Sequence, residues 1–176
     1  MSGFKIVQTQ MQDQNLIIEA LETAFPEFKG RIEVANRPIQ MQGHGQEAAN
    51  IVIRSRNMHG KAEDHGYADM GLRLVGDRFE WVISDCDQGN YEKNADGTPN
   101  QAGHYNSSYG NYGPEFQGEV MAAYSALEGL AEAERVGWRA TGATQQMTDP
   151  DIGNCWGTEV EISEEELNKL QVHLPA

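Results

Sequence analysis

Residues 66–85 decide the fold, and they read GYADMGLRLVGDRFEWVISD. Apolar residues alternate at Met70, Leu72 and Leu74, and the alternation resumes after Gly76-Asp77 at Phe79, Trp81 and Ile83. A period of two is typical of a strand with one buried face, and a Gly-Asp pair between two such runs is typical of a hairpin turn. The stretch therefore predicts an antiparallel β-hairpin.

Strand and helix patterns continue on both sides of the hairpin. Strands are expected at 4–11, 31–35, 51–53, 138–147 (interrupted by Gly142) and 158–162, with a connection at 38–48. Apolar residues at helical spacing predict one helix that begins near Asp13 and ends before Pro26, and another over 114–136. Ser163 and Glu166 have the spacing of a capping box, which predicts a short helix after them.

This order of elements predicts an α+β protein. We expect an antiparallel sheet with two long helices packed on one face, as a ferredoxin-like variant, because strands joined by hairpins exclude a purely parallel sheet. The length of 176 residues suits a single domain over 1–176. Within it we expect an inserted loop at 86–113 and a short C-terminal helix and tail at 163–176.

The charge of the chain limits its partners. A formal net charge of −14 opposes binding to nucleic acid or to an anionic membrane and favours a partner with a basic surface. No apolar run approaches the roughly 20 residues that span a bilayer, and no leader segment is apparent, so we expect a soluble, cytoplasmic protein. Cys86 and Cys155 lie far apart without Cys-x-x-Cys spacing, and no secretory signal is apparent, so both are expected to be reduced thiols.

Several stretches together resemble a known family. They are 4–11 (FKIVQTQM) with Asp13 and Leu16, 48–54 (AANIVIR), 67–73 (YADMGLR), the strand at 79–84, and, more weakly, Tyr124, Gly137-Trp138 and 159–162 (EVEI). In this order they are similar to the hypothetical chloroplast reading frame 35 family, a domain of unknown function in plastids, cyanobacteria and other bacteria. The resemblance covers most of the chain except residues 86–113 and the C-terminal tail.

The resemblance implies a role but no reaction. The family has no established activity, and its members are often encoded near AAA-type ATPases, which suggests an accessory or adaptor protein. The long insertion departs from the family pattern. A specialised activity of this chain would therefore belong to the insertion.

The insertion has the composition of a recognition loop. Four of the six tyrosines of the chain lie between Gln88 and Gly113, among glycines and asparagines. Tyrosine supplies rigid contact area and small polar residues supply adaptable hydrogen bonds. The predicted binding residues are Tyr91, His104, Tyr105, Tyr109 and Tyr112; the alternative is a decoration packed on its own domain.

Metal binding and catalysis have weaker support. Asp85 and Asp87 would point to one side if the strand continued, which predicts at most a weak Ca²⁺ or Mg²⁺ site, because the ligand spacing of an EF-hand is missing. The histidines and cysteines lack zinc-site spacing.

Cys86 with His104 is a poor nucleophile pair beside two aspartates. Asp69 and Glu80, expected to face each other across the hairpin, suit a surface ion-pair ladder with nearby arginines.

We therefore expect a noncatalytic accessory or interaction protein that needs no cofactor. Its partner would be a protein with a basic surface, a second copy of itself or an AAA-type ATPase, engaged through the sheet and the Tyr-rich loop. The alternative is a module that binds a small ligand or a divalent cation. An enzyme of unknown reaction comes third.

Overall fold

The computed structural model describes residues 3–43, 45–58, 68–89 and 112–172. Contacts group the chain into two compact units. The first consists of Met1–Gln14 and Phe25–Gly118, and the second of Asn15–Ala24 and Glu119–Ala176. The single domain predicted from the sequence stays a prediction.

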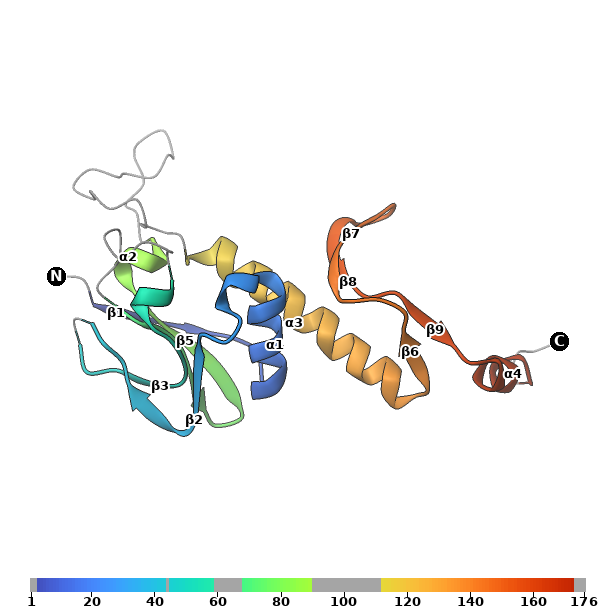
Figure 1. Cartoon of the computed structure of the whole chain (residues 1–176), viewed down its shortest axis with the longest axis horizontal. Helices are drawn as coiled ribbons and strands as arrows, with labels where there is room; N and C mark the ends of the chain where they lie inside the picture. Colours follow the sequence, from blue (N-terminus) through green and yellow to red (C-terminus); the bar gives the residue numbers. More distant parts are fainter. Residues whose placement is uncertain (1–2, 44, 59–67, 90–111, 173–176) are drawn as a thin grey trace. The chain divides into compact units, whose positions relative to one another are not determined.

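A five-stranded antiparallel sheet forms the first unit. Its strands are β1 (Phe4–Gln8), β2 (Ile32–Gln40), β3 (Ala48–Ile53), β4 (Met70–Val75) and β5 (Arg78–Ser84). Their order across the sheet is β1-β5-β4-β3-β2, and every neighbouring pair is antiparallel (Figure 1). The predicted α+β class and antiparallel sheet are confirmed, whereas the finer ferredoxin-like arrangement is not.

The predicted hairpin is present at its predicted turn. Leu72 lies opposite Trp81, and Val75 lies opposite Arg78. Gly76, between the two strands, has a φ of 66°, a conformation that side chains with a Cβ rarely adopt. The glycine at this position therefore allows the tight connection.

One face of the sheet carries an aromatic cluster. Trp81 is 2% exposed, and its ring centroid lies 5.7 Å from that of Phe116, in the first turn of α3 (Pro114–Arg135). Phe116 also contacts Phe25, which precedes the short helix η1 (Pro26–Phe28), and Phe28, which ends it, with centroid distances of 4.5 and 6.2 Å. Trp81 is therefore buried against the first turn of α3.

The opposite face has a small core of its own. Met41, Ala49, Val52 and Val82 form a buried cluster, against which Phe4 and Ile39 pack. A Cβ at Gly71 would lie 2.6 Å from the Cβ of Ala49, so only glycine allows β3 and β4 to approach this closely. Burial on both faces explains why four successive residues of β5, from Trp81 to Ser84, are all buried.

An irregularity separates the two ends of the β2–β3 ladder. The register shifts between Val34 and Ile39, and β2 extends to Gln40 where the sequence predicts a connection from Pro38. Pro38 fits because β2 is an edge strand, and an edge strand tolerates a residue that lacks an N–H donor. Buried Asn50 compensates nearby: its Oδ1 accepts from the backbone N–H of Leu74 at 3.0 Å, and its Nδ2 donates to the carbonyl of Ala35 at 3.3 Å.

The second unit consists of helices and small sheets. Beyond α1 (Gln14–Ala24) and most of α3, it contains β6 (Trp138–Ala140), β7 (Gln145–Asp149), β8 (Gly153–Gly157), β9 (Val160–Ile162) and α4 (Glu164–Val172). Strand β6 pairs with β9, and β7 pairs with β8. The β7–β8 hairpin was not predicted, because 145–149 (QQMTD) lacks an apolar alternation.

Three predicted helices lie close to their expected positions. Both long helices bury apolar side chains at helical spacing, namely Ile17, Ala20 and Leu21 in α1 and Val120, Ala123, Tyr124 and Leu127 in α3. The backbone N–H of Glu166 donates to Oγ of Ser163 at 3.2 Å, which confirms Ser163 as the cap of α4. Packing of both long helices on one sheet face stays a prediction. Among the described helices, none is both long and apolar enough to cross a bilayer.

Truncation of the central tryptophan tests the aromatic core. We expect Trp81→Ala to lower the free energy of unfolding by about 3 to 5 kcal/mol, because it opens a cavity under Phe116. Leu74→Ala on the same hairpin is the control, since Leu74 is 46% exposed and its truncation should cost far less. Urea titration followed by circular dichroism measures both, and wild-type stability of Trp81→Ala would contradict the assignment.

Candidate functional site

The predicted binding residues divide between described and undescribed parts of the chain. Tyr91, His104, Tyr105 and Tyr109 lie outside the described residues, so their binding role stays a prediction. Tyr112 is described, as are the backbone and side chains of Asp85 and Asp87. Asp85 and Asp87 show the structure at the N-terminal end of the predicted loop, and Tyr112 shows it at the C-terminal end.

Tyr112 belongs to the core of the first unit. Its side chain is 6% exposed, and its ring centroid lies 4.9 Å from that of Phe116 and 6.4 Å from that of Phe28. Its hydroxyl donates to the backbone carbonyl of Met58. In this structure Tyr112 is therefore a core side chain and not an exposed aromatic anchor.

The aspartates at the other end of the loop lie in a helical turn. The strand stops at Ser84, and Asp85–Gln88 form α2, which Gly89 ends with a φ of 71°. The Ser84 hydroxyl accepts from the N–H of Asp87 at 3.1 Å and donates to its Oδ2 at 2.5 Å. The strand continuation that would place Asp85 and Asp87 on one side is therefore wrong.

Asp85 has partners of its own. Its Oδ2 accepts from the backbone N–H of Gly3 at 2.9 Å, and Nζ of Lys5 lies 3.6 Å from its Oδ1. These contacts attach the N-terminal strand to the start of α2. In the part of the chain that the structure describes, no three His, Cys, Asp or Glu side chains gather as metal ligands would.

A glutamine joins the two ends of the loop. Gln117, in the first turns of α3, donates from Nε2 to Oε1 of Gln88 at 2.5 Å and to the carbonyl of Tyr112 at 3.0 Å. The N–H of Tyr112 also donates to the carbonyl of Asp87 at 3.0 Å. Asp87, Gln88 and Tyr112, inside the range of 86–113 predicted as an insertion, are therefore hydrogen-bonded within the first unit.

Asp69 is a buried structural carboxylate. The sequence suggested that Asp69 faces Glu80, but it does not. Its Oδ2 accepts from Nη1 of Arg54 at 2.7 Å and from the N–H of Gln42 at 2.8 Å. Its Oδ1 accepts from the N–H of Ser55 at 2.9 Å. The side chain is completely buried, so these donors replace the water that the charge has lost.

Arg54 also binds a second carboxylate nearer the surface. Its Nη2 lies 2.6 Å from Oε2 of Glu33, which is 42% exposed. This hydrogen bond, with the positive charges of Arg54 and Arg56, lowers the pKa of Glu33 despite some desolvation. The same bond raises the pKa of Arg54, with a smaller contribution from Asp69.

A second arginine also lies between two carboxylates. Arg73 is opposite Glu80 in the β4–β5 ladder, and its Nη2 lies 2.8 Å from Oε1 of that residue. Its Nη1 lies 2.9 Å from Oε2 of Glu47. The hydrogen bond to Glu80 is the largest cause that raises the pKa of Arg73. The ion-pair ladder suggested by the sequence thus exists, with Arg73 and Glu80 as its members.

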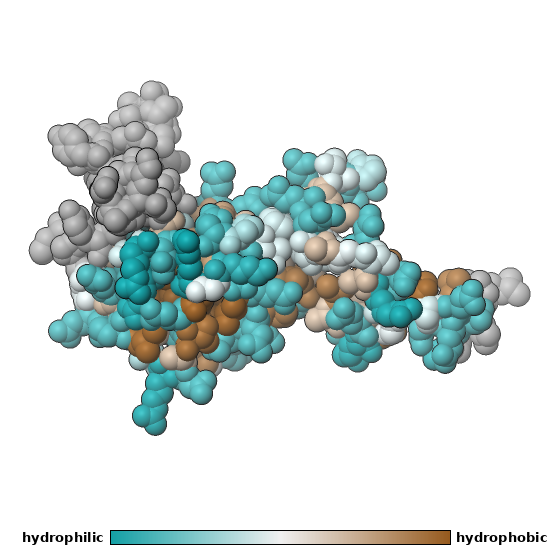
Figure 2. All heavy atoms as spheres, in the orientation of Figure 1, coloured by the Kyte–Doolittle hydropathy of each residue, from teal (hydrophilic) through white to brown (hydrophobic). Residues whose placement is uncertain are grey.

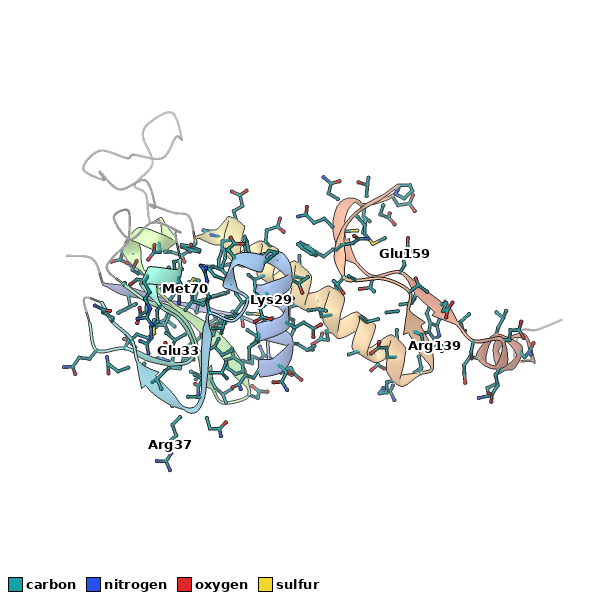
Figure 3. All side chains as sticks on the ribbon, in the orientation of Figure 1. Lys29, Glu33, Arg37, Met70, Arg139 and Glu159 are labelled. Carbon is teal, nitrogen blue, oxygen red and sulfur yellow. The ribbon has the colours of Figure 1, made fainter. Side chains whose placement is uncertain are left out.

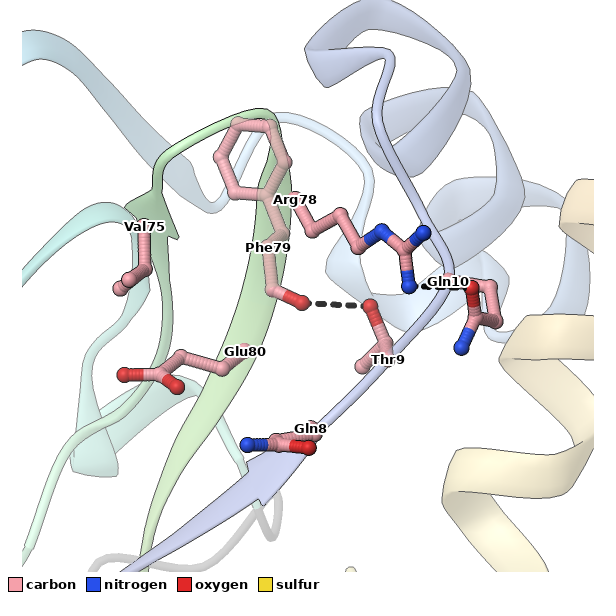
Figure 4. A pocket seen from close by; sticks show the side chains of 7 residues that line it. All are labelled: Gln8, Thr9, Gln10, Val75, Arg78, Phe79 and Glu80. Carbon is pink, nitrogen blue, oxygen red and sulfur yellow. Dashed lines mark hydrogen bonds between the residues drawn. The ribbon is translucent and has the colours of Figure 1, made fainter.

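A polar hollow of about 200 Å³ lies at the end of the hairpin. Figure 4 shows the Thr9 hydroxyl directed at the carbonyl of Phe79, at 2.5 Å, and the Arg78 guanidinium directed at Oε1 of Gln10, at 2.7 Å. Both polar groups are thus engaged within the protein. The lining residues include no cysteine, histidine or serine, and the Thr9 hydroxyl already donates to a backbone carbonyl.

A larger groove lies within the second unit, between α3 and the β7–β8 hairpin. Its volume is about 490 Å³, and its lining includes Glu119, Ala122, Ala126, Gln146, Cys155 and Trp156. Oε2 of Glu119 accepts from the indole N–H of Trp156 at 2.8 Å and from Nε2 of Gln146 at 3.4 Å. No pattern in the sequence indicates this site, because Glu119 and Trp156 are 37 residues apart and belong to no motif.

Comparisons with protein-family models, with curated proteins and with solved structures find no match for this chain. Functional inference therefore depends on its own residues.

Loss of the Tyr112 hydroxyl tests its core role. We expect Tyr112→Phe to lower the free energy of unfolding at neutral pH by about 1 to 3 kcal/mol, because the Met58 carbonyl loses its donor. Burial, with the negative charges of Asp87 and Glu27, raises the pKa of Tyr112 above its ordinary value of 10.0. The folded state then holds the phenol proton more tightly than the unfolded chain, so this contribution is present below pH 10 and is lost as the pH rises further.

The measurement is the stability difference between wild type and Tyr112→Phe across pH 7 to 11. We expect the difference to shrink above about pH 10. A difference that stays constant or grows in that range would show that the phenol is not protected from ionisation.

Removal of one carboxylate from each side of Arg54 tests the buried pair. We expect Asp69→Ala to destabilise the fold by about 3 to 5 kcal/mol, because it removes the buried carboxylate partner of Arg54 and leaves two backbone N–H groups without their acceptors. Glu33→Ala should cost about 1 kcal/mol or less, because that carboxylate is partly exposed. Thermal and urea unfolding measure both. Equal effects would contradict the structural role of Asp69.

Proposed function

We propose that this chain is a noncatalytic accessory protein that binds a protein partner with a basic surface. The observation that carries the proposal is the uneven charge of the two units. The second unit contains thirteen acidic residues and three lysines and arginines, a formal charge of −10 out of −14 for the chain. A concentrated negative field attracts a basic surface and speeds its association.

Most acidic side chains of this unit are exposed, and the unit also exposes several large apolar side chains. Glu159, Glu161, Glu164 and Glu165 are all exposed; Figure 3 shows Glu159 and Arg139 in the β6–β9 region. The exposed apolar side chains of the same unit are Val136, Trp138, Ile152 and Leu167. Figure 2 shows brown, hydrophobic residues among teal, hydrophilic ones on the visible surface of the molecule. Apolar groups with a charged rim are common in protein interfaces.

The small sheets of this unit also favour an interaction role. Strands β6 and β9 form a two-stranded sheet, and every residue of β6 is exposed. Two-stranded sheets are marginally stable alone and leave backbone groups at their edges that can pair with another chain. A bound partner would stabilise them. The like charge of this unit disfavours a second copy as that partner.

The first unit favours structure over catalysis. The buried carboxylate of Asp69 is held by Arg54 and by backbone donors, that of Asp87 is held by Ser84, and Arg73 is paired on both sides. The Tyr-rich segment at 90–111 is a second candidate contact surface, on composition alone. The two surfaces can be separated by experiment.

Purification of the full-length protein from its native host, followed by binding to the purified partner, tests the proposal. We expect the partner to have a basic surface and the Kd to rise with salt. A triple variant (Glu159→Gln, Glu161→Gln, Glu164→Gln) should weaken binding roughly tenfold, as expected for loss of several surface charge pairs.

The matched control neutralises exposed acids of the first unit, in the triple variant Glu27→Gln, Asp77→Asn, Glu115→Gln. It should bind within about twofold of wild type, since it removes the same charge elsewhere. Equal weakening by both variants would show a general field without a contact surface. Replacement of 90–111 by a Gly/Ser linker tests the other surface. If this replacement abolishes partner binding while the triple variant of Glu159, Glu161 and Glu164 binds normally, the assignment to the second unit is overturned.

A further inference from the structure

The groove between α3 and the β7–β8 hairpin contains a carboxylate with unused capacity. Both hydrogen bonds of Glu119 are accepted by Oε2. Within the described residues, its Oε1 accepts no hydrogen bond and Glu119 forms no ion pair. A carboxylate held in place by one oxygen can receive a charged donor at the other without reorganisation.

The rest of the groove suits a long side chain with a flat cationic end. Trp156 lines the groove and fixes the carboxylate, so an aromatic ring and a negative charge occur at one site. Guanidinium groups stack on aromatic rings and donate to carboxylates in a fixed geometry. Ala122 and Ala126, one helical turn apart, line the groove from α3. Their small side chains leave room for the aliphatic stem of an arginine.

From this arrangement we propose that the Glu119–Trp156 groove binds an arginine side chain in an exposed segment of a protein partner. The inference rests on the proposed function, because it names the chemistry that the basic partner presents. The charge of −10 on the unit that contains the groove selects a cationic occupant over a neutral or acidic one. The volume of about 490 Å³ also admits residues that flank the arginine.

The indole N–H of Trp156 reports directly on the site. In ¹H–¹⁵N spectra of the full-length protein, each of its three tryptophans gives one indole signal, and Trp156→Phe identifies the signal at the groove. The probe is the blocked peptide Ac-Ala-Arg-Ala-Arg-NH₂, and its neutral match carries citrulline at both arginine positions. We expect a saturable shift of the Trp156 signal with the arginine peptide only.

Variants of α3 identify the contact. Glu119→Gln keeps an oxygen that can accept from the indole, so it removes the charge and preserves the groove. It should raise the Kd of the arginine peptide roughly tenfold. Ala122→Leu should have a similar effect by filling the groove, and because Ala122 is exposed, the fold should be retained.

The controls lie nine residues further along the same helix, which places them on its opposite face. Glu128→Gln and Ala131→Leu repeat the two chemical changes at exposed positions and should leave the Kd unchanged within about twofold. The proposal is overturned if the citrulline peptide binds equally well, if a lysine peptide binds as tightly as the arginine peptide, or if Glu119→Gln behaves like Glu128→Gln.

The two proposals fail separately. Suppose that the arginine peptide does not bind, but that the triple variant of Glu159, Glu161 and Glu164 binds a basic partner more weakly than wild type does. The groove assignment is then wrong and the accessory role stands. If the peptide binds as expected but no partner with a basic surface exists, the groove is a cation site and the accessory role is wrong.

Discussion

Burial of the β4–β5 hairpin on both faces is the constraint on which the first unit depends. Trp81 faces the aromatic cluster around Phe116, while Val82, the next residue, faces the smaller core of Met41 and Val52. A strand buried on both sides cannot shift its register by one residue, because every side chain would enter the wrong core. Gly71 adds to this constraint, because a Cβ there would meet Ala49. The position of the hairpin thus fixes its neighbouring strands.

Polar groups inside this unit serve the same geometry. Asn50 supplies an acceptor to Leu74 and a donor to Ala35, so the ladders on both sides of β3 remain satisfied where the register shifts. Asp69 does the same for the N–H groups of Gln42 and Ser55, and Arg54 balances its charge. A buried polar group without a hydrogen-bond partner destabilises the folded state by more than a typical hydrogen bond stabilises it. These residues therefore specify the fold more than they add to its stability.

The sequence predicted what is local and missed what is distant. The hairpin, the long helices and the Ser163 cap follow from periods and spacings within a few residues, and the structure has them. The predicted strand ends before the observed end of β2, because a proline such as Pro38 indicates a break. An edge strand, however, needs no backbone donor at that position. The Asp69–Arg54 pair and the Glu119–Trp156 groove depend on residues that only the folded chain brings together. No local pattern distinguishes these carboxylates from the many others of an acidic chain.

The bridge that Gln117 forms between Gln88 and Tyr112 has a consequence for engineering. It holds the two chain segments that flank 90–111 within hydrogen-bonding distance of one side chain. A guest domain whose own termini lie close together could replace those residues without separating the two ends. The entropy of closing such a connection grows only slowly with its length. A fluorescent protein placed there would label the molecule internally and leave both termini of the chain unaltered.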